Sequence, residues 1–315
     1  MQTILGSGGA IGIPLARELK RYTDRIRLVS RNPKRVNDSD ELFSLDLADF
    51  SRISEAVAGS DVVYVTVGFQ YSLKVWRRTW PPFMKAVIDA CKRQNAKLVF
   101  FDNVYVYAKS AIPHMTEDSP IQPPSKKGLV RQQLHEMIMS EAGNHSLKAL
   151  IARSADFLGP DTNNSVIGET VAKNLIKGKK AQVFGDVNKI HTFTYTPDAA
   201  KAAALLGNTI DAYDQVWHVP TTKERLTMLH WIELFANELH REPRIRRIPK
   251  PLFYLLGVLL PLMREFPEMM YQNKIDYVFD SSKFEKRFGI VATPPAESVR
   301  VTVDYLRRTL QPRGT

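Results

Sequence analysis

The sequence is poor in the residues that build disulfides and metal centres. Cys91 is the only cysteine among 315 residues, so no disulfide can form within the chain and a cytoplasmic location is expected. The seven histidines are scattered, with no pair at the spacing of metal ligands. We therefore expect neither a zinc nor an iron site.

Long apolar runs are also missing. The longest, residues 252–263, is interrupted by Gly257 and Pro261 and is too short to span a bilayer. We interpret it as a buried or interface helix, with a membrane-surface anchor as the alternative. The N-terminus enters an apolar strand at once, so no signal peptide is expected.

Positive charge is in excess, with a formal net charge of +11. Such a charge suits a polyanionic partner, whether nucleic acid, a membrane surface or a phosphorylated small molecule. The basic clusters at 177–180, 241–250 and 307–308 are not interleaved with aromatic residues, and no nucleic-acid motif is found. The expected partner is a small and anionic substrate, without nucleic acid or membrane. A homodimer is compatible with the sequence.

A glycine-rich turn follows the first apolar run. Gly6, Gly9 and Gly12 are spaced three residues apart, and helical periodicity begins directly after them. A strand that delivers such a turn to a helix N-terminus can hold a pyrophosphate, because backbone amides and the helix dipole face the anion. The alternative is an ordinary surface turn. The residues expected to touch the nucleotide here are Gly6, Ser7, Gly9, Ala10, Ile11 and Gly12.

Strand and helix patterns alternate through residue 160. Further strands are expected at 26–30, 42–46, 61–67, 97–102 and 147–152, and helices at 11–21, 50–58, 75–94 and 128–142. This alternation predicts an α/β Rossmann fold, a doubly wound parallel sheet with a dinucleotide at its switch point. Residues 1–160 would form the NAD(P)-binding core. Residues 161–315 would form a small, mostly helical substrate-side part, with a returning strand at 215–219 and helices at 199–206, 226–239, 250–266 and 295–310.

The end of the second strand bears on the choice of cofactor. A carboxylate here would bind the ribose 2′-hydroxyl of NAD, but Ser30 and Arg31 stand in its place, with Lys34 and Arg35 close by. A guanidinium suits a 2′-phosphate, so NADP is favoured over NAD. The alternative is a plain exposed basic turn.

Four motifs together resemble the atypical and extended short-chain dehydrogenases/reductases, the NAD-dependent epimerase/dehydratase proteins. They are the Gly-x-x-Gly-x-x-Gly turn, DNVYVY at 102–107, RSADFLGP at 153–160 and HTFTYTPD at 191–198. The resemblance implies adenine contacts at Asp46 and Leu47 and a close backbone approach at Val67 and Gly68. It also implies cofactor contacts at Asn103 and Ser154.

The family's catalytic Tyr-x-x-x-Lys pair is matched by letter at Tyr105 and Lys109. Their segment is expected to be a strand or strand exit, where positions i and i+4 lie about 13 Å apart, so the match is interpreted as coincidence. The resemblance instead places Lys127 where the tyrosine stands and Arg131 where the lysine stands. It also puts Asn103 in the place of the family's serine and Tyr107 in that of the tyrosine after it.

The candidate catalytic residues are therefore Tyr105, Tyr107, Asn103 and Lys127. A second cation one helical turn from Lys127 disfavours its protonated form, which makes it a candidate proton donor. Core packing of the tyrosines and a solvated helix start at 126–127 are the alternatives. His191 replaces the arginine that binds substrate phosphate in extended members, which speaks against a sugar nucleotide.

Together these observations predict an NAD(P)-dependent oxidoreductase or epimerase that acts on a small carbonyl or hydroxyl compound. The alternative is a non-catalytic NAD(P)-binding sensor, which the loss of both catalytic partners would favour.

Overall fold

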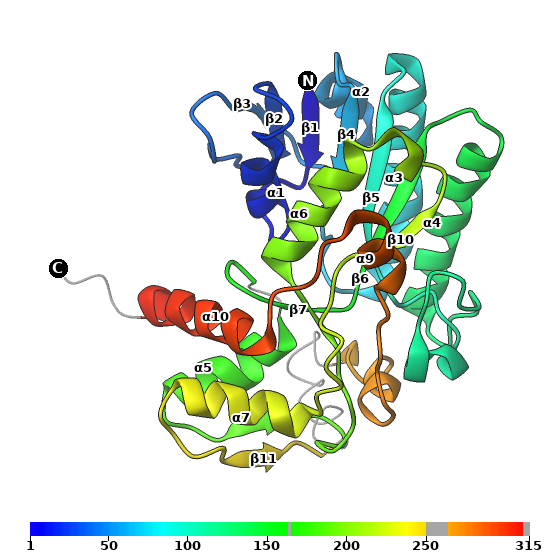
Figure 1. The fold of residues 1–315 in the computed structure, drawn as a ribbon. Coiled ribbons are helices and arrows are strands. Elements are labelled where there is room, and N and C mark those ends of the chain that lie inside the picture. The colour runs from blue at the N-terminus through cyan, green and yellow to red at the C-terminus, as the bar shows by residue number, and fades with distance from the viewer. Residues whose placement is uncertain (163–164, 250–263, 311–315) are drawn as a thin grey trace. The chain divides into compact units, whose positions relative to one another are not determined.

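The computed structural model describes residues 1–162, 165–249 and 264–310. Its centre is a sheet of seven parallel strands in the order β10-β6-β5-β4-β1-β2-β3 (Figure 1). The strands are β1 (Gln2–Leu5), β2 (Ile26–Ser30), β3 (Glu41–Ser44), β4 (Val62–Val65), β5 (Lys97–Asn103), β6 (Ala149–Ser154) and β10 (Val216–His218). After β3 the chain returns to the other side of β1, so the switch point lies between β1 and β4. The predicted doubly wound sheet is confirmed.

Helices cover both faces of this sheet, which explains why β1, β4 and β6 are buried along their whole length. One face carries α2 (Ile53–Val57), α3 (Leu73–Gln94) and α4 (Lys126–Gly143), and the other carries α1 (Gly12–Leu19) and α6 (Thr196–Gly207) (Figure 1). Alternate strand residues point to opposite faces. Val63 and Val65 accordingly join the core under α2, α3 and α4, whereas Tyr64 lies against Gly207 at the end of α6.

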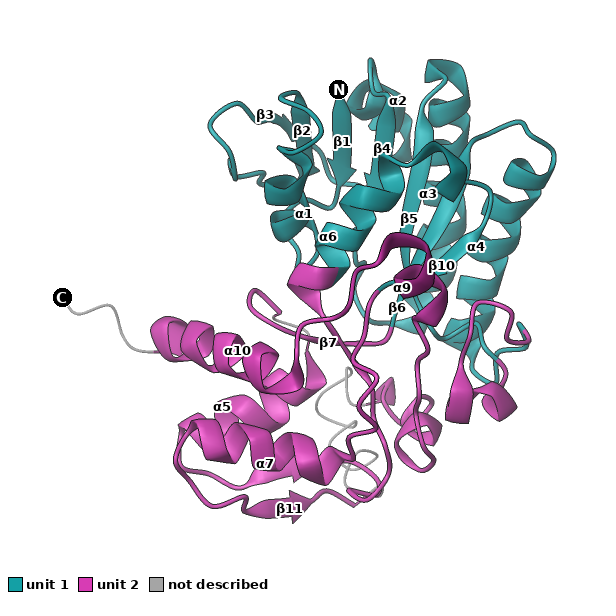
Figure 2. Cartoon of the chain, viewed as in Figure 1, with its two compact units in different colours: residues 1–107, 121–154, 199–219 teal, residues 108–120, 155–198, 220–315 magenta. Residues whose placement is uncertain are grey.

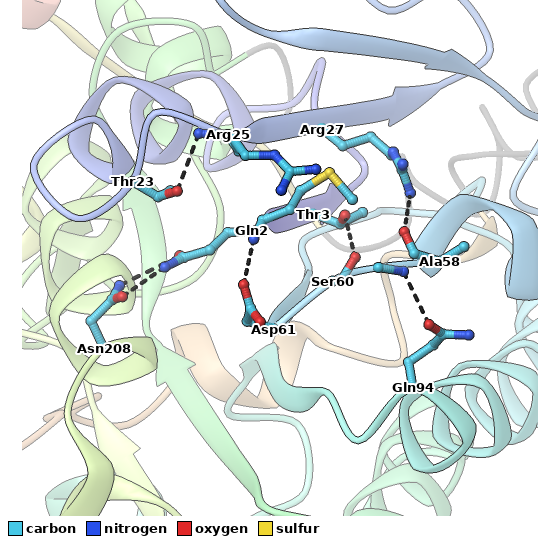
Figure 3. A network of polar contacts seen from close by, with 12 residues as sticks. Gln2, Thr3, Thr23, Arg25, Arg27, Ala58, Ser60, Asp61, Gln94 and Asn208 are labelled. Carbon is cyan, nitrogen blue, oxygen red and sulfur yellow. Dashed lines mark hydrogen bonds and ion pairs between the residues drawn. The ribbon is translucent and has the colours of Figure 1, made fainter.

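Polar side chains close the amino-terminal edge of the sheet (Figure 3). The Gln2 side-chain amide donates to Asn208 Oδ1 at 2.7 Å, and the hydroxyls of Thr3 and Ser60 lie 2.7 Å apart. These bonds connect β1 to the residue after α6 and to the segment between α2 and β4. The carboxyl edge, where the glycine turn lies, is therefore the edge available for a ligand.

The described chain divides into two compact units (Figure 2). The first comprises residues 1–107, 121–154 and 199–219 and contains the whole seven-stranded sheet. The second comprises residues 108–120, 155–198 and 220–315. The chain passes between the units several times rather than once at residue 160. Whether 1–160 and 161–315 fold as separate domains stays a prediction.

The second unit has its own apolar core and two short parallel strand pairs. Its strands are β7 (Asp156–Leu158), β8 (Ala181–Val183), β9 (Phe193–Tyr195) and β11 (Ile245–Arg247), with β7 paired to β9 and β8 to β11. Its helices are α5 (Lys173–Ile176), α7 (Met228–Glu238), α9 (Ser282–Phe288) and α10 (Pro295–Leu310). The helix predicted at 250–266 and the apolar run 252–263 fall largely outside the described residues. Within the described ranges, no helix is long and apolar enough to cross a bilayer.

Candidate active site at the carboxyl edge of the sheet

The glycine turn is held tightly between β2, β4 and α1. The amides of Gly6 and Ser7 both donate to the carbonyl of Val29, at 2.9 and 3.2 Å. Gly6 has a φ of +104°, and a Cβ built on it would lie 2.4 Å from the Val67 amide nitrogen. A Cβ on Gly12 would lie 2.5 Å from the Gly6 carbonyl oxygen. Packing within the protein therefore requires glycine at positions 6 and 12.

The middle of the turn is different, because it is open. A Cβ on Gly8 would meet nothing within 4 Å, and one on Gly9 would meet only the Gly6 carbonyl oxygen at 3.8 Å. Both residues are exposed and lie four and three residues before α1 begins at Gly12, and the first amide groups of a helix lack intrahelical partners. The missing side chains leave space for a ligand to approach these amides, so the turn fits a dinucleotide pyrophosphate.

The other predicted cofactor residues follow the carboxyl ends of neighbouring strands. Arg31 follows β2 and is exposed, and Asp46 follows β3 with its Oδ1 accepting from the Ala48 amide at 3.0 Å. Asn103 and Ser154 end β5 and β6 and are paired in register. All therefore lie along one edge of one sheet, while their contacts with a nucleotide stay a prediction.

The residues in the family's catalytic positions lie at the start of α4. Ser125 caps this helix by accepting from the Gly128 amide, and a Cβ on Gly128 would lie 2.4 Å from the Tyr105 carbonyl oxygen. The Lys127 side chain is fully buried, with Nζ 4.8 Å from the ring centroid of Tyr71. The solvated helix start is therefore wrong for Lys127 and holds only for Lys126, which is exposed.

Arg131 lies one turn further along α4 and packs against indole rings. Its guanidinium carbon is 4.2 Å from the ring centroid of Trp80 and 4.7 Å from that of Trp76, a cation–π arrangement. Its Nη1 lies 3.5 Å from Asp102 Oδ1, and Arg153 Nη2 lies 3.4 Å from Asp102 Oδ2. The carboxylate of Asp102 is thus the counter-ion of two buried guanidiniums. Burial lowers the pKa of Arg131 despite the opposing effect of Asp102.

The two candidate tyrosines have different surroundings. Tyr107 is fully buried, its hydroxyl lies 2.6 Å from His218 Nε2, and the Arg153 guanidinium lies over its ring. This geometry is that of core packing, and a catalytic role for Tyr107 stays a prediction. Tyr105 is only partly buried, and its backbone amide donates to Asn103 Oδ1 at 3.0 Å. It lies in a turn after β5, so it shares no helix with Lys109, as predicted.

His191, in the second unit, is poorly placed to bind a phosphate. Its side chain is 4 % exposed, its Nε2 lies 2.9 Å from Asp156 Oδ2, and its ring stacks on Tyr277 at 4.4 Å. The neighbouring carboxylate would repel an anion. The structure therefore gives His191 a packing role.

Several members of the site were missed from the sequence. They are Tyr71, Trp76, Trp80, Asp102 and Arg153. One signal was available: Asp102 and Arg153 are opposite charges near the carboxyl ends of two apolar runs, and they prove to be register partners across β5 and β6. Among the described residues, no group of His, Cys, Asp or Glu could hold a metal ion.

The comparisons with known proteins agree with this geometry. The model of the NAD dependent epimerase/dehydratase family matches residues 3–219. The chain belongs to this family. Membership confirms the resemblance to the NAD-dependent epimerase/dehydratase proteins that the sequence motifs indicated.

Three proteins illustrate what the chain is similar to, each at low sequence identity. A 3β-hydroxysteroid dehydrogenase/decarboxylase isoform from Arabidopsis thaliana is 24% identical over 304 residues, covering 84% of this chain and 51% of the relative. The chain thus spans about half of that relative's length. UDP-D-apiose/UDP-D-xylose synthase from Oryza sativa is 20% identical over 74% of this chain and 72% of its own. UDP-glucuronic acid 4-epimerase from Bacillus cereus has a TM-score of 0.79 at 15% identity, covering 98% of this chain and all of its own, which establishes the shared fold.

The buried cluster predicts a dependence of stability on pH through His135 of α4. Its Nδ1 lies 3.4 Å from Arg153 Nη2, and burial together with that cation lowers the pKa of His135 to about 4. An unfolded histidine has a pKa of about 6.5, so only the unfolded state gains a proton as the pH falls from there towards 4. Stability is therefore lost on acidification.

Between about pH 7.5 and pH 5, the free energy of unfolding of the wild type should fall by about 1–2 kcal/mol more than that of His135→Gln. Urea unfolding of both proteins at the two pH values measures this difference. Equal losses in the wild type and in His135→Gln would contradict the assignment.

Proposed function

We propose that the protein is an NAD(P)-dependent oxidoreductase or epimerase acting on a hydroxyl or carbonyl group of a small molecule. The observation that carries the proposal is the contrast within the glycine turn. Gly6 and Gly12 are required by packing, whereas Gly8 and Gly9 leave open space at the β1/β4 switch point. This is where the fold binds a dinucleotide.

The names of the relatives support the substrate class. They describe enzymes of a 3β-hydroxysteroid and of UDP-sugars, which have hydroxyl groups in common. An anionic substrate is supported by the exposed basic side chains of Lys74, Arg77 and Arg78 in the first turns of α3. A cytoplasmic location and a homodimer complete the proposal.

The chain's own residues would bind and orient the cofactor, whose nicotinamide supplies hydride transfer when bound. Amides of the turn would hold the pyrophosphate, and Asp46 would contact the adenosine end. Val67 and Gly68, which follow β4 beside the turn, would allow the backbone to pass close to the nucleotide. The remaining contacts proposed are Ser7, Ala10, Ile11, Arg31, Leu47, Asn103 and Ser154.

A preference for NADP is tested by fluorescence titration with NADPH and NADH. Arg31→Ala is expected to weaken NADPH binding about tenfold or more and to leave NADH binding unchanged, because only the 2′-phosphate needs the guanidinium. Arg25→Ala is the matched control, since Arg25 is an exposed arginine at the opposite end of β2. Equal affinities of wild type and Arg31→Ala for NADPH would leave NAD as the cofactor. Failure of both nucleotides to bind would overturn the proposed function.

The non-catalytic sensor shares the same nucleotide site, so turnover distinguishes it from an enzyme. We expect absorbance at 340 nm to report oxidation of a hydroxyl compound in a panel of UDP-sugars and 3β-hydroxysteroids. Nucleotide binding without turnover of any of them would support the sensor.

A further inference from the structure

A buried ammonium lies beneath a partly exposed phenol at the carboxyl edge of the sheet. Lys127 Nζ is 4.8 Å from the ring centroid of Tyr71, and the Tyr71 hydroxyl lies 3.4 Å from that of Tyr105. Resting on the proposed function, we propose that Tyr71 is the catalytic acid and base that exchanges a proton with the substrate oxygen. Lys127 is its positioning and activating residue.

The difference in burial separates the two roles. Lys127 is 0 % exposed, so its ammonium cannot reach a substrate in solution. Tyr71 and Tyr105 are only partly buried and can do so. The proton donor expected from the sequence, Lys127, is thus placed behind the group that meets the substrate. As in the family's Tyr-x-x-x-Lys pair, a phenol and an ammonium are adjacent. Here the phenol is that of Tyr71, in the segment between β4 and α3.

Tyr71 belongs to the same stretch of chain that closes the glycine turn. A Cβ on Gly6 would touch the Val67 amide nitrogen, and Tyr71 follows four residues later, before α3 begins at Leu73. β4 and β5 are neighbours in the sheet, which brings Tyr105 to the same edge. The phenol therefore lies beside the expected nucleotide site rather than at a remote surface.

The charges around Tyr71 favour its ionised form. From α4, Lys127 lies against its ring, and Arg131 lies close enough that Tyr71 stabilises the Arg131 charge. From α3 the neutral Trp76 packs edge-on at 5.6 Å, and from the segment after β5 the neutral Tyr105 offers a hydroxyl. The Arg131 charge is paired with Asp102, so the cation that acts on Tyr71 most directly is Lys127, whose ammonium lies against the ring and stabilises a phenolate.

The proposed step balances as an alcohol oxidation. The substrate O–H bond breaks and its proton passes to the phenolate oxygen of Tyr71. The adjacent C–H bond breaks and its electron pair leaves as hydride to oxidised NAD(P), the oxidant, while the oxygen lone pair forms the C=O bond. Ketone reduction is the reverse. The hydroxyl of Tyr105, 3.4 Å away, can relay the proton onward.

The test is a pH titration of protein labelled with ¹³C at the tyrosine ring carbon that carries the hydroxyl. The chain has eleven tyrosines, and the signal absent from Tyr71→Phe belongs to Tyr71. We expect this signal to titrate at least one pH unit below the usual value of about 10, and to return to about 10 or higher in Lys127→Met. Tyr22 is the internal reference, because burial raises its pKa.

A Tyr71 signal that titrates at or above 10 in the wild type would overturn the proposal, even if Lys127→Met does not fold. The same holds if the low-titrating signal disappears in Tyr105→Phe instead. In a second measurement, NAD⁺ binding is followed by calorimetry and the labelled spectrum is recorded with NAD⁺ present. Bound NAD⁺ should shift the Tyr71 signal and leave that of Tyr22 in place.

The two proposals fail separately. If NAD⁺ does not bind, the proposed function falls, while the titration still decides whether Lys127 activates Tyr71. If NAD⁺ binds and the Tyr71 signal does not move, the nucleotide site stands and Tyr71 is not its catalytic residue.

Discussion

Replacing Asp102 by alanine is expected to lower the free energy of unfolding by about 3–5 kcal/mol. Its carboxylate lies 3.5 Å from Arg131 and 3.4 Å from Arg153, and all three side chains are buried. Within the described chain, each guanidinium already has two nitrogens without a hydrogen-bond partner, and Asp102 Oδ1 also has none. Removing the carboxylate would leave two cations in the interior without a counter-ion, beside the buried Lys127. Urea unfolding followed by circular dichroism measures the change.

Two comparisons isolate the electrostatic part of this loss. Glu55→Ala breaks the exposed ion pair of Glu55 with Arg52 and should cost less than about 1 kcal/mol. Combining Asp102→Ala with Arg131→Met removes one of the two cations that lack a counter-ion and places an apolar side chain against the indoles of Trp76 and Trp80. The double variant should therefore have a higher free energy of unfolding than Asp102→Ala alone. A loss in Asp102→Ala no larger than that in Glu55→Ala would show that Asp102 is not the counter-ion.

Much of the first unit could be predicted from local pattern. The strands of the parallel sheet are short apolar runs between helical segments, and the predicted 26–30 coincides with β2. The prediction for α10, at 295–310, also coincides with the structure, since Pro295 fixes its start. The third strand was placed slightly late, at 42–46 instead of Glu41–Ser44. Leu45 and Leu47 are buried beyond the strand and extend its apolar pattern.

All four short strands of the second unit, β7, β8, β9 and β11, were missed for a physical reason. Each has three residues, and the exposed Arg246 and Arg247 hide β11 among the basic residues at 241–250. A run this short has no periodicity to detect. Only its pairing with a distant segment defines it as a strand.

The site shows the same division between local and long-range information. The glycine turn was found because strand, turn and helix are contiguous. The Lys127 and Arg131 positions were found by resemblance, but their burial was not, because the rings that cover them come from Tyr71 and from Trp76 and Trp80 of α3. No local pattern connects these segments to α4, since the contacts depend on how β4 and β5 are ordered in the sheet.

Substitutions in the glycine turn should separate folding from cofactor binding, and those at its close-packed ends should have the larger effect on stability. Gly6→Ala places a Cβ 2.4 Å from a backbone nitrogen at a φ of +104°, and Gly12→Ala places one 2.5 Å from a carbonyl oxygen. Backbone strain and overpacking each cost about 1–3 kcal/mol, so Gly6→Ala should lose about 2–6 kcal/mol and Gly12→Ala somewhat less. Thermal unfolding measures both. Melting temperatures equal to the wild type would contradict the tight packing.

Gly9→Val is expected to do the opposite: to keep the fold and lose the cofactor. Its Cβ would have only one neighbour, at 3.8 Å, so stability should change by no more than about 0.5–1 kcal/mol. The added side chain would stand where a pyrophosphate must approach the amides, and NADH affinity should fall by more than about tenfold in a fluorescence titration. Gly143→Ala is the matched control, because its Cβ also meets nothing within 4 Å but lies at the far end of α4. Unchanged NADH binding in Gly9→Val would mean that the open space at the turn has a use other than the dinucleotide. If NADH affinity falls in Gly9→Val and is unchanged in Gly143→Ala, the loss arises at the glycine turn.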